Sequence, residues 1–176
     1  GYLTITGYDE RFKKYLLGFP NKEVEEGFIN FLLPLYSSAG TDSPFIVDEF
    51  VHDVETGKPE QFMQRMKAFF ADTSYQVVGN AELYFQNVMY LVFKMMGFYT
   101  QVERPTSDGR IDAIIQTADY IYIIECKLDG SADEALEQIA TNHYDAPFAM
   151  DKRKLIKIGI NFSSETRGVE SWKIEE

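Results

Sequence analysis

Three charged residues interrupt apolar segments in the second half of the chain. Asp112 stands within the apolar segment 111–115, and Glu125 and Lys127 follow the apolar segment 121–124. Asp, Glu and Lys side chains are seldom buried without partners, so these positions are candidates for chemistry. Two carboxylates held close together repel each other unless one is protonated or a cation lies between them. Mg²⁺ prefers such oxygen ligands, so the residue types indicate a divalent-metal site beside a lysine.

The spacing of these residues predicts how they meet. Side chains alternate along a β-strand, so Glu125 and Lys127 share one face and Cys126 takes the other, where we expect it to be buried. In a hairpin that turns symmetrically at residues 118–119, Asp112 pairs with Glu125, and the Cβ atoms of such a pair lie about 5 Å apart. A structural ion pair between Lys127 and either carboxylate is the alternative that the pattern leaves open.

A further carboxylate precedes this pair in the sequence. Glu82 stands in line with Phe85, Met89 and Met96 at helical spacing within a helix expected over residues 81–96. It begins an otherwise apolar stripe and is therefore a candidate for facing the sheet. An acidic residue in a first helical turn also complements the helix dipole, which is the alternative reading of Glu82.

The elements that must position these residues follow from hydrophobic periodicity. The first part of the chain is expected to hold a hairpin and helices, with loops between them: a hairpin over 2–19 turning at 7–10, helices over 21–38, 59–73 and 81–96, and a loop at 40–44. The second part is expected to be mainly strands: 98–103, 111–117, 120–127, 155–162 and 168–174, with a helix over 131–144. Ser131 and Glu134 form a capping box at the start of that last helix.

Composition limits the class of protein. Hydrophobic residues make up 45% of the 176 positions, and 14 Phe, 11 Tyr and 1 Trp suffice for a sizeable core. The single cysteine excludes an intramolecular disulfide and favours a reducing, cytoplasmic location. No apolar run reaches the length of a membrane span. His52 and His143 lack cysteine partners and form no zinc pattern.

The charge of −11 argues against a surface that holds nucleic acid by bulk electrostatics. The basic cluster is Lys152, Arg153 and Lys154 with Lys157, enough to neutralise about three or four phosphates. Such a cluster is usually a solvated turn. We therefore expect the chain alone to bind nucleic acid weakly and in a salt-dependent way.

The order of a helix Glu82, a strand Asp112 and a following Glu125-x-Lys127 resembles the PD-(D/E)-x-K nuclease superfamily. The amino-acid sequence of residues 109–140 resembles one group more specifically: the nuclease-like domain at the C-terminus of prokaryotic AAA-ATPase-like proteins. The segment 17–24 is similar to the segment that links ATPase and nuclease in that group.

This resemblance implies an α/β fold, a restriction-endonuclease-like mixed β-sheet core flanked by helices and preceded by a small hairpin-plus-helices section. The change from helices to strands along the chain places a boundary near residues 74–80, so a hairpin and helical linker section over 1–75 is expected to precede a nuclease-like domain over 76–176. Asp112 and Glu125, with Glu82, would hold Mg²⁺ or Mn²⁺, and Lys127 would lie near the scissile phosphate. Ile111 replaces the proline that usually precedes the motif aspartate.

Two residues of the last helix correspond to a Gln and a Tyr that related nucleases often place at the site. They are Gln138 and Tyr144, whose spacing is longer than usual, so Gln138 is the better candidate. The implied partners are a DNA or RNA substrate and an upstream AAA-ATPase-like domain, docked on the helical section 22–73. A non-catalytic module of the same fold, binding protein or nucleic acid, is the alternative function.

Overall fold

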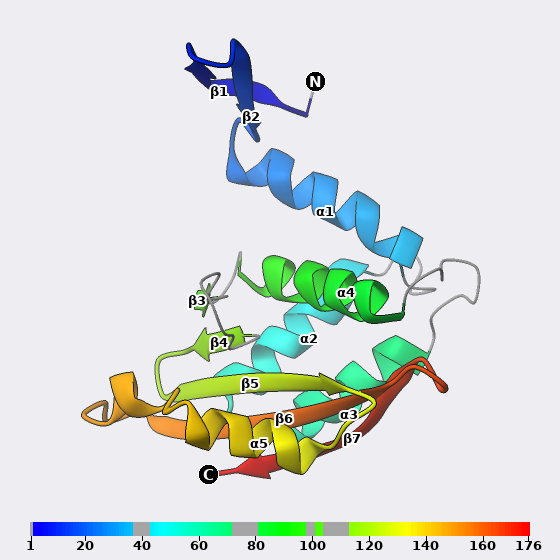
Figure 1. Ribbon diagram of the computed structural model, residues 1–176, viewed down its shortest axis with the longest axis vertical. Coiled ribbons are helices and arrows are strands. Elements are labelled where there is room, and N and C mark those ends of the chain that lie inside the picture. The colour runs from blue at the N-terminus through cyan, green and yellow to red at the C-terminus, as the bar shows by residue number, and fades with distance from the viewer. Residues whose placement is uncertain (1, 37–42, 72–80, 98–100, 104–112) are drawn as a thin grey trace.

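The computed structural model describes residues 2–36, 43–71, 81–97, 101–103 and 113–176 (Figure 1). The elements are β1 (Thr4–Asp9), β2 (Lys14–Gly18), α1 (Lys22–Tyr36), α2 (Ser43–Glu55), α3 (Pro59–Ala71), α4 (Ala81–Met96), β3 (Gln101–Glu103), β4 (Ala113–Gln116), β5 (Tyr120–Leu128), α5 (Ala132–Thr141), β6 (Lys154–Ser163) and β7 (Gly168–Glu175), with a short 3₁₀ helix at Ala146–Phe148.

The centre of the molecule is a five-stranded mixed sheet in the order β3-β4-β5-β6-β7. β5 and β6 run parallel, as the crossover through α5 requires, and the other neighbours are antiparallel. The predicted class is therefore confirmed: this is a restriction-endonuclease-like α/β fold, with a mixed sheet flanked by helices and preceded by a hairpin and further helices.

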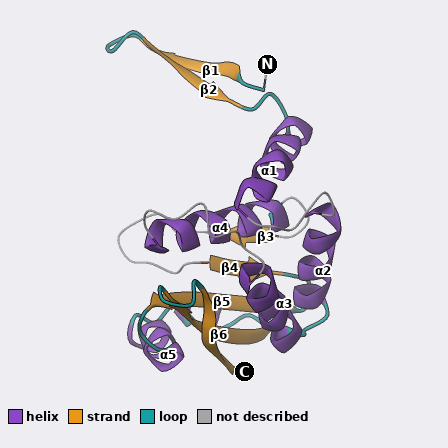
Figure 2. Cartoon of the chain, turned by 90° about the vertical axis from the view of Figure 1, so that its right-hand side faces the viewer, coloured by secondary structure: helices purple, strands orange, loops and turns teal. Residues whose placement is uncertain are grey.

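Helices cover the two faces of the sheet (Figure 2). On one face, Ile123 of β5 packs against Leu136 and Ile139 of α5. On the other, α2, α3 and α4 bury most of their apolar side chains against the sheet in one large cluster that includes Tyr122 and Ile124. Successive residues of β5 therefore alternate between the two helical layers, and almost all of Ile121–Glu125 is buried.

The helix α2 was not expected from the sequence. Residues 40–44 were read as a loop, whereas α2 begins at Ser43 and runs to Glu55. Its buried positions Val47, Phe50, Val51 and Val54 have the spacing of one helical face. The hydroxyl of Tyr122 donates a 2.8 Å hydrogen bond to the Val54 carbonyl and thereby ties this helix to the sheet.

The predicted division between 1–75 and 76–176 falls at residues 72–80, which lie outside the described residues, and it stays a prediction. Packing shows that α2 and α3 share their core with the sheet, since Phe50 and Phe62 belong to the same buried cluster as Ile115 and Tyr122. Residues 43–71 are thus part of the body that the sheet organises.

The N-terminal hairpin is present, but its turn lies later than predicted. β1 continues through residues 7–9, and the chain reverses at 10–13. The Asp9 carboxylate accepts the N–H groups of Arg11 (2.9 Å) and Phe12 (3.0 Å), and Lys13 takes a positive φ of 52°. This side-chain-to-backbone turn, rather than Gly7, sets the reversal. The hairpin projects from the body beyond α1 (Figure 1).

Candidate active site

The register between β4 and β5 is the one predicted from the sequence. Ala113 pairs with Ile124 and Gln116 pairs with Ile121. Asp112, which the prediction places opposite Glu125, lies outside the described residues. Glu82 belongs to α4, but its side chain is also outside the described part of the structure. The roles of both residues therefore stay predictions.

Glu125 and Lys127 lie on the face of β5 that α5 covers, because Ile123, two residues earlier on the same face, packs against that helix. Glu125 is only 3% exposed, which is unusual for a carboxylate. The Lys127 Nζ atom lies 3.9 Å from Glu125 Oε1, at the outer limit of an ion pair. A nearly buried carboxylate and a partly exposed ammonium group therefore stand side by side.

Gln138 joins this pair from the helix. The Lys127 ammonium group donates a hydrogen bond to Gln138 Oε1 across the gap between β5 and α5. The start of α5 is fixed by Ser131, whose hydroxyl accepts the N–H of Glu134 at 3.1 Å, as a helix cap should. Tyr144 packs instead against the cluster between α5 and the sheet, and its hydroxyl accepts a hydrogen bond from Asn142.

Two residues of β6 support the site and were not anticipated. Asn161 pairs in register with Lys127 and is 2% exposed; its Oδ1 accepts the Gly130 N–H at 3.0 Å, and its Nδ2 donates to Glu170 at 2.7 Å. It thus anchors the loop between β5 and α5. The signal was present in the sequence, because Asn161 is a polar residue inside the apolar run 155–162.

Gly159 is the second supporting residue, and it pairs with Glu125. A Cβ atom at this position would lie 2.3 Å from the Ala132 carbonyl oxygen and 3.1 Å from the Ala135 Cβ. The absence of a side chain lets the first turn of α5 approach the sheet directly over the strand pair that carries Glu125.

The loop between β5 and α5 is held at a second point. Asp129 adopts a positive φ of 54°, and its carboxylate accepts hydrogen bonds from the Ser164 hydroxyl (2.6 Å) and the Ser164 N–H (2.8 Å). These bonds hold the pKa of Asp129 below its ordinary value. Two adjacent residues of this loop, Asp129 and Gly130, are therefore held in place before α5 begins.

The donor chemistry around Glu125 suits a hard divalent cation, since a carboxylate is the ligand that Mg²⁺ prefers. Among the described residues, however, no three His, Cys, Asp or Glu side chains gather closely enough to hold a metal ion. Of the three predicted metal ligands, only Glu125 has a described side chain, so the metal-binding role of all three residues stays a prediction.

Cys126 was expected to be buried on the reverse face of β5. It does pack against the core on the side of α2, α3 and α4, opposite to α5, but it is only partly buried. The reason is its place near the end of the strand, where Cys126, Lys127 and Leu128 are all partly exposed.

Most of the basic cluster proposed to contact phosphates is engaged by acidic residues. Arg153 pairs with Asp151 at 2.7 Å, Lys157 with Asp145 at 2.7 Å, and Lys154 with Glu176. Hydrogen bonds from the Arg153 side chain and backbone lower the pKa of Asp151 to about 2, so its carboxylate is ionised at any pH near neutrality. Three of the four cations are therefore already neutralised within the chain.

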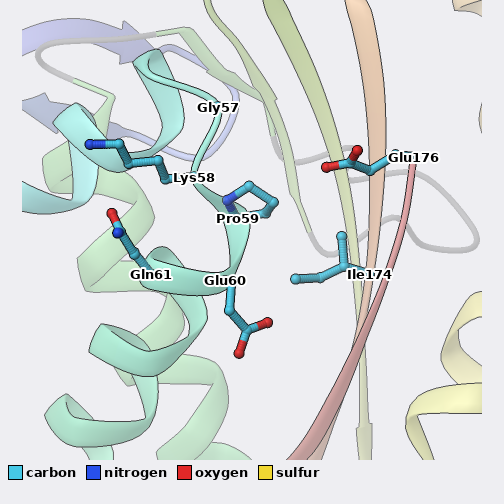
Figure 3. Close-up of a pocket in the computed structure, with 7 residues that line it drawn as sticks. All are labelled: Gly57, Lys58, Pro59, Glu60, Gln61, Ile174 and Glu176. Carbon is cyan, nitrogen blue, oxygen red and sulfur yellow. The ribbon is translucent and has the colours of Figure 1, made fainter.

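A pocket of about 470 Å³ lies elsewhere, between the start of α3 and the end of β7 (Figure 3). It is lined by residues 57–61 with Ile174 and Glu176. None of the predicted site residues lines it. Within the described residues, no helix is long and apolar enough to cross a membrane.

Comparison with known proteins places this geometry in a family. Residues 80–172, more than half of the chain, match the PD-(D/E)XK nuclease superfamily. The chain belongs to this superfamily, whose members typically use divalent metal ions. The matched region contains Glu82, Asp112, Glu125, Lys127 and Gln138.

A longer relative is similar over nearly the whole chain. It is the "Uncharacterized protein in vnfD 5'region" of Azotobacter chroococcum mcd 1, which is 27% identical over 189 residues. The alignment covers 99% of this chain, but the chain spans only 36% of the length of that relative. No solved structure matches.

Proposed function

We propose that this domain hydrolyses phosphodiester bonds in DNA or RNA with Mg²⁺ or Mn²⁺. One observation carries the proposal: β5 presents a nearly buried Glu125 beside a Lys127 that is held by Gln138. Membership of the nuclease superfamily supports it. The register of β4 and β5, continued by one pair, would bring Asp112 opposite Glu125.

In this proposal Asp112 and Glu125 hold the metal ion, with Glu82 as a further ligand. A bound divalent ion would activate water and offset charge on the phosphoryl oxygens. Lys127 orients the attacking nucleophile or stabilises negative charge on the phosphate through its ammonium group. Gln138 accepts a hydrogen bond from Lys127 and so fixes the direction in which that ammonium group points.

The proposal predicts metal-dependent cleavage. Single- and double-stranded DNA and RNA should be cut by the purified chain in the presence of Mg²⁺ or Mn²⁺ and left intact in EDTA, because in this mechanism the metal ion lowers the pKa of the attacking water and offsets charge on the phosphoryl oxygens. The measurement is product formation on labelled oligonucleotides, with metal binding followed in parallel by calorimetry. Cleavage that persists in EDTA would contradict this mechanism.

The alternative is a non-catalytic module of the same fold. The charge of −11 and the internal pairing of the basic cluster favour it over an enzyme that captures its substrate unaided. Metal binding at Asp112 and Glu125 without cleavage of any of the four substrates would support this second function.

We further propose that an AAA-ATPase-like region of a longer polypeptide delivers nucleic acid to the domain in the cytoplasm. The size of the relative from Azotobacter chroococcum is compatible with additional regions. The chain has a single cysteine, Cys126, which suits a reducing compartment.

Weak binding by the chain alone is the corresponding expectation. With a net charge of −11 and three of the four cations of the basic cluster paired, the chain should bind oligonucleotides weakly. The affinity should fall about tenfold or more as salt rises from ~50 to ~200 mM. Fluorescence anisotropy with single- and double-stranded oligonucleotides in EDTA measures this without cleavage. Tight binding that is insensitive to salt would show that delivery by another region is unnecessary.

A further inference from the structure

Asn161 is a buried polar side chain that lies beside the candidate site. It pairs in register with Lys127 in the parallel ladder of β5 and β6, so the two side chains share the face of the sheet that α5 covers. Burial of an amide group without hydrogen bonds would cost free energy. A buried Asn within an apolar strand therefore needs partners at both ends of its amide.

The two partners of Asn161 fix the orientation of its amide. The Oδ1 atom accepts the Gly130 N–H at 3.0 Å, and the Nδ2 atom donates to Glu170 Oε2 at 2.7 Å. An N–H group can bond only to the oxygen end of the amide, and a carboxylate can bond only to the nitrogen end. Because β6 lies between β5 and β7 in the sheet (Figure 1), Asn161 connects the edge strand to the loop that follows Lys127.

A β-bulge in β7 brings Glu170 to Asn161. Asn161 pairs with Ser171, but the next residue, Phe162, pairs with Val169, so β7 has one extra residue at Glu170. In a regular ladder Glu170 would lie opposite Phe162, whose side chain is buried in the core on the side of α2, α3 and α4. The bulge places Val169 in that core instead and directs Glu170 toward Asn161.

The other partner, Gly130, lies against the side chain of Lys127. A Cβ atom at Gly130 would lie 3.2 Å from the Lys127 Cβ and 3.6 Å from the Lys127 Cγ. The backbone at Gly130 is therefore next to the base of the Lys127 side chain, whereas Gln138 accepts a hydrogen bond from the ammonium group at its other end. A displacement of the Gly130 peptide would change the space open to the stem of Lys127 and thus the direction of its ammonium group.

We propose that Asn161 is a positioning residue for Lys127, which acts through Gly130, and that Glu170 keeps Asn161 in the orientation this requires. Asn161 holds the Gly130 peptide, and that peptide confines the stem of Lys127, so the ammonium group stays beside Gln138. The effect on catalysis rests on the proposed nuclease function, whereas the effect on the position of Lys127 does not.

An exchange of hydrogen-bonding groups between positions 161 and 170 tests the proposal. Asn161→Asp keeps an oxygen for the Gly130 N–H, but it removes the donor to Glu170 and sets two carboxylates against each other. We expect kcat for cleavage to fall roughly ten- to a hundredfold with little change in KM, because a misplaced Lys127 weakens interactions made in the transition state. Addition of Glu170→Gln should restore kcat, since the new amide can donate to the new carboxylate.

Asn21→Asp is the matched control for the single variant. Asn21 is exposed, and its Oδ1 accepts the Val24 N–H at 2.9 Å, which an Asp oxygen can do equally well at a helix cap. This control should keep the wild-type kcat. A wild-type kcat for Asn161→Asp, or a double variant that stays as impaired as the single one, overturns the proposal.

Gly130→Ala reaches Lys127 without a change in any charge. Its new Cβ would press on the Lys127 Cβ at 3.2 Å, so this variant should also lower kcat and leave KM nearly unchanged. It keeps the test decisive if Asn161→Asp fails to fold. A Gly130→Ala variant with the wild-type kcat would contradict the proposed contact between the loop and Lys127.

NMR spectroscopy of the chain without substrate tests the position of Lys127 independently of cleavage. In the wild type we expect slow exchange of the Gly130 amide proton and distinct chemical shifts for the two ε protons of Lys127, because both groups are held. Asn161→Asp should speed the exchange and merge the two shifts, and the double variant should recover both. If the Gly130 amide responds and the Lys127 signals do not, Asn161 only anchors the loop and the proposal is wrong. A chain that shows the expected changes but cleaves no substrate supports the positioning role and contradicts the proposed nuclease function instead.

Discussion

Substitution of Glu125 by Gln is expected to lower metal-dependent cleavage by about a thousandfold or more while leaving the domain folded. Gln has nearly the same shape as Glu but carries no charge, so its amide oxygen binds a hard cation much more weakly than a carboxylate does. Because Glu125 is only 3% exposed, the loss of its charge also removes a desolvation cost. The free energy of unfolding should therefore stay unchanged or rise in the absence of metal.

Glu137→Gln is the matched control for this variant. Glu137 is an exposed residue of α5, immediately before Gln138. Its substitution therefore makes the same chemical change on the solvent side of the helix. We expect wild-type cleavage from Glu137→Gln. Lys127→Ala and Asp112→Asn should behave like Glu125→Gln.

Two quantities should be measured for each variant in the same buffer, namely the rate of cleavage and the midpoint of unfolding. A folded Glu125→Gln variant that keeps most of its activity would exclude Glu125 as a metal ligand. A variant that unfolds would instead assign Glu125 a structural role, with Lys127 as its ion-pair partner 3.9 Å away.

Local patterns were sufficient to predict the elements that carry the candidate site. The helix at 81–96 was predicted with the bounds that α4 has, because a long apolar stripe fixes both its type and its ends. The register of β4 and β5 followed from a short turn at 118–119, which leaves little freedom in how the two strands pair.

Features that depend on distant residues were not predictable in the same way. The helix α2 was missed because the turn-forming residues at 40–44 suggested a loop, although its apolar spacing was present. Asn161 and Gly159 act on a loop and a helix about 30 residues earlier. The sequence marks Asn161 as a polar residue within a strand, but no local pattern shows which residues it contacts. The basic cluster likewise looked available for phosphates because the partners of Lys157 and Lys154 lie at Asp145 and Glu176.

The contact between Gly159 and α5 makes a strong prediction about stability. In Gly159→Ala the new Cβ would lie 2.3 Å from the backbone oxygen of Ala132 and 3.0 Å from Leu136 Cγ. Backbone cannot move aside as a flexible side chain can, so α5 must shift away from the sheet. Overpacking of this kind costs about 1–3 kcal/mol, which for a domain of this size lowers the unfolding midpoint by roughly 3–10 °C.

Gly27→Ala is the matched control, because it is the same substitution in open space. Nothing lies within 4 Å of a Cβ atom at Gly27, which is an exposed residue inside α1. Alanine is favoured over glycine in a helix by about 0.5–1 kcal/mol, so this variant should be slightly more stable than wild type. Thermal denaturation should therefore show a lower unfolding midpoint for Gly159→Ala and a slightly higher one for Gly27→Ala.

The same substitution also tests how the fold positions the site. A shift of α5 moves Gln138 away from Lys127, since the packing of this helix on β5 and β6 brings the two side chains together. We therefore expect Gly159→Ala to lose cleavage activity even below its unfolding temperature, whereas Gly27→Ala keeps it. If Gly159→Ala is as stable and active as Gly27→Ala, the close packing of α5 on β6 is not required to keep Gln138 beside Lys127. In that case the hydrogen bonds of Asn161 and Asp129 to the preceding loop must be sufficient to position the helix.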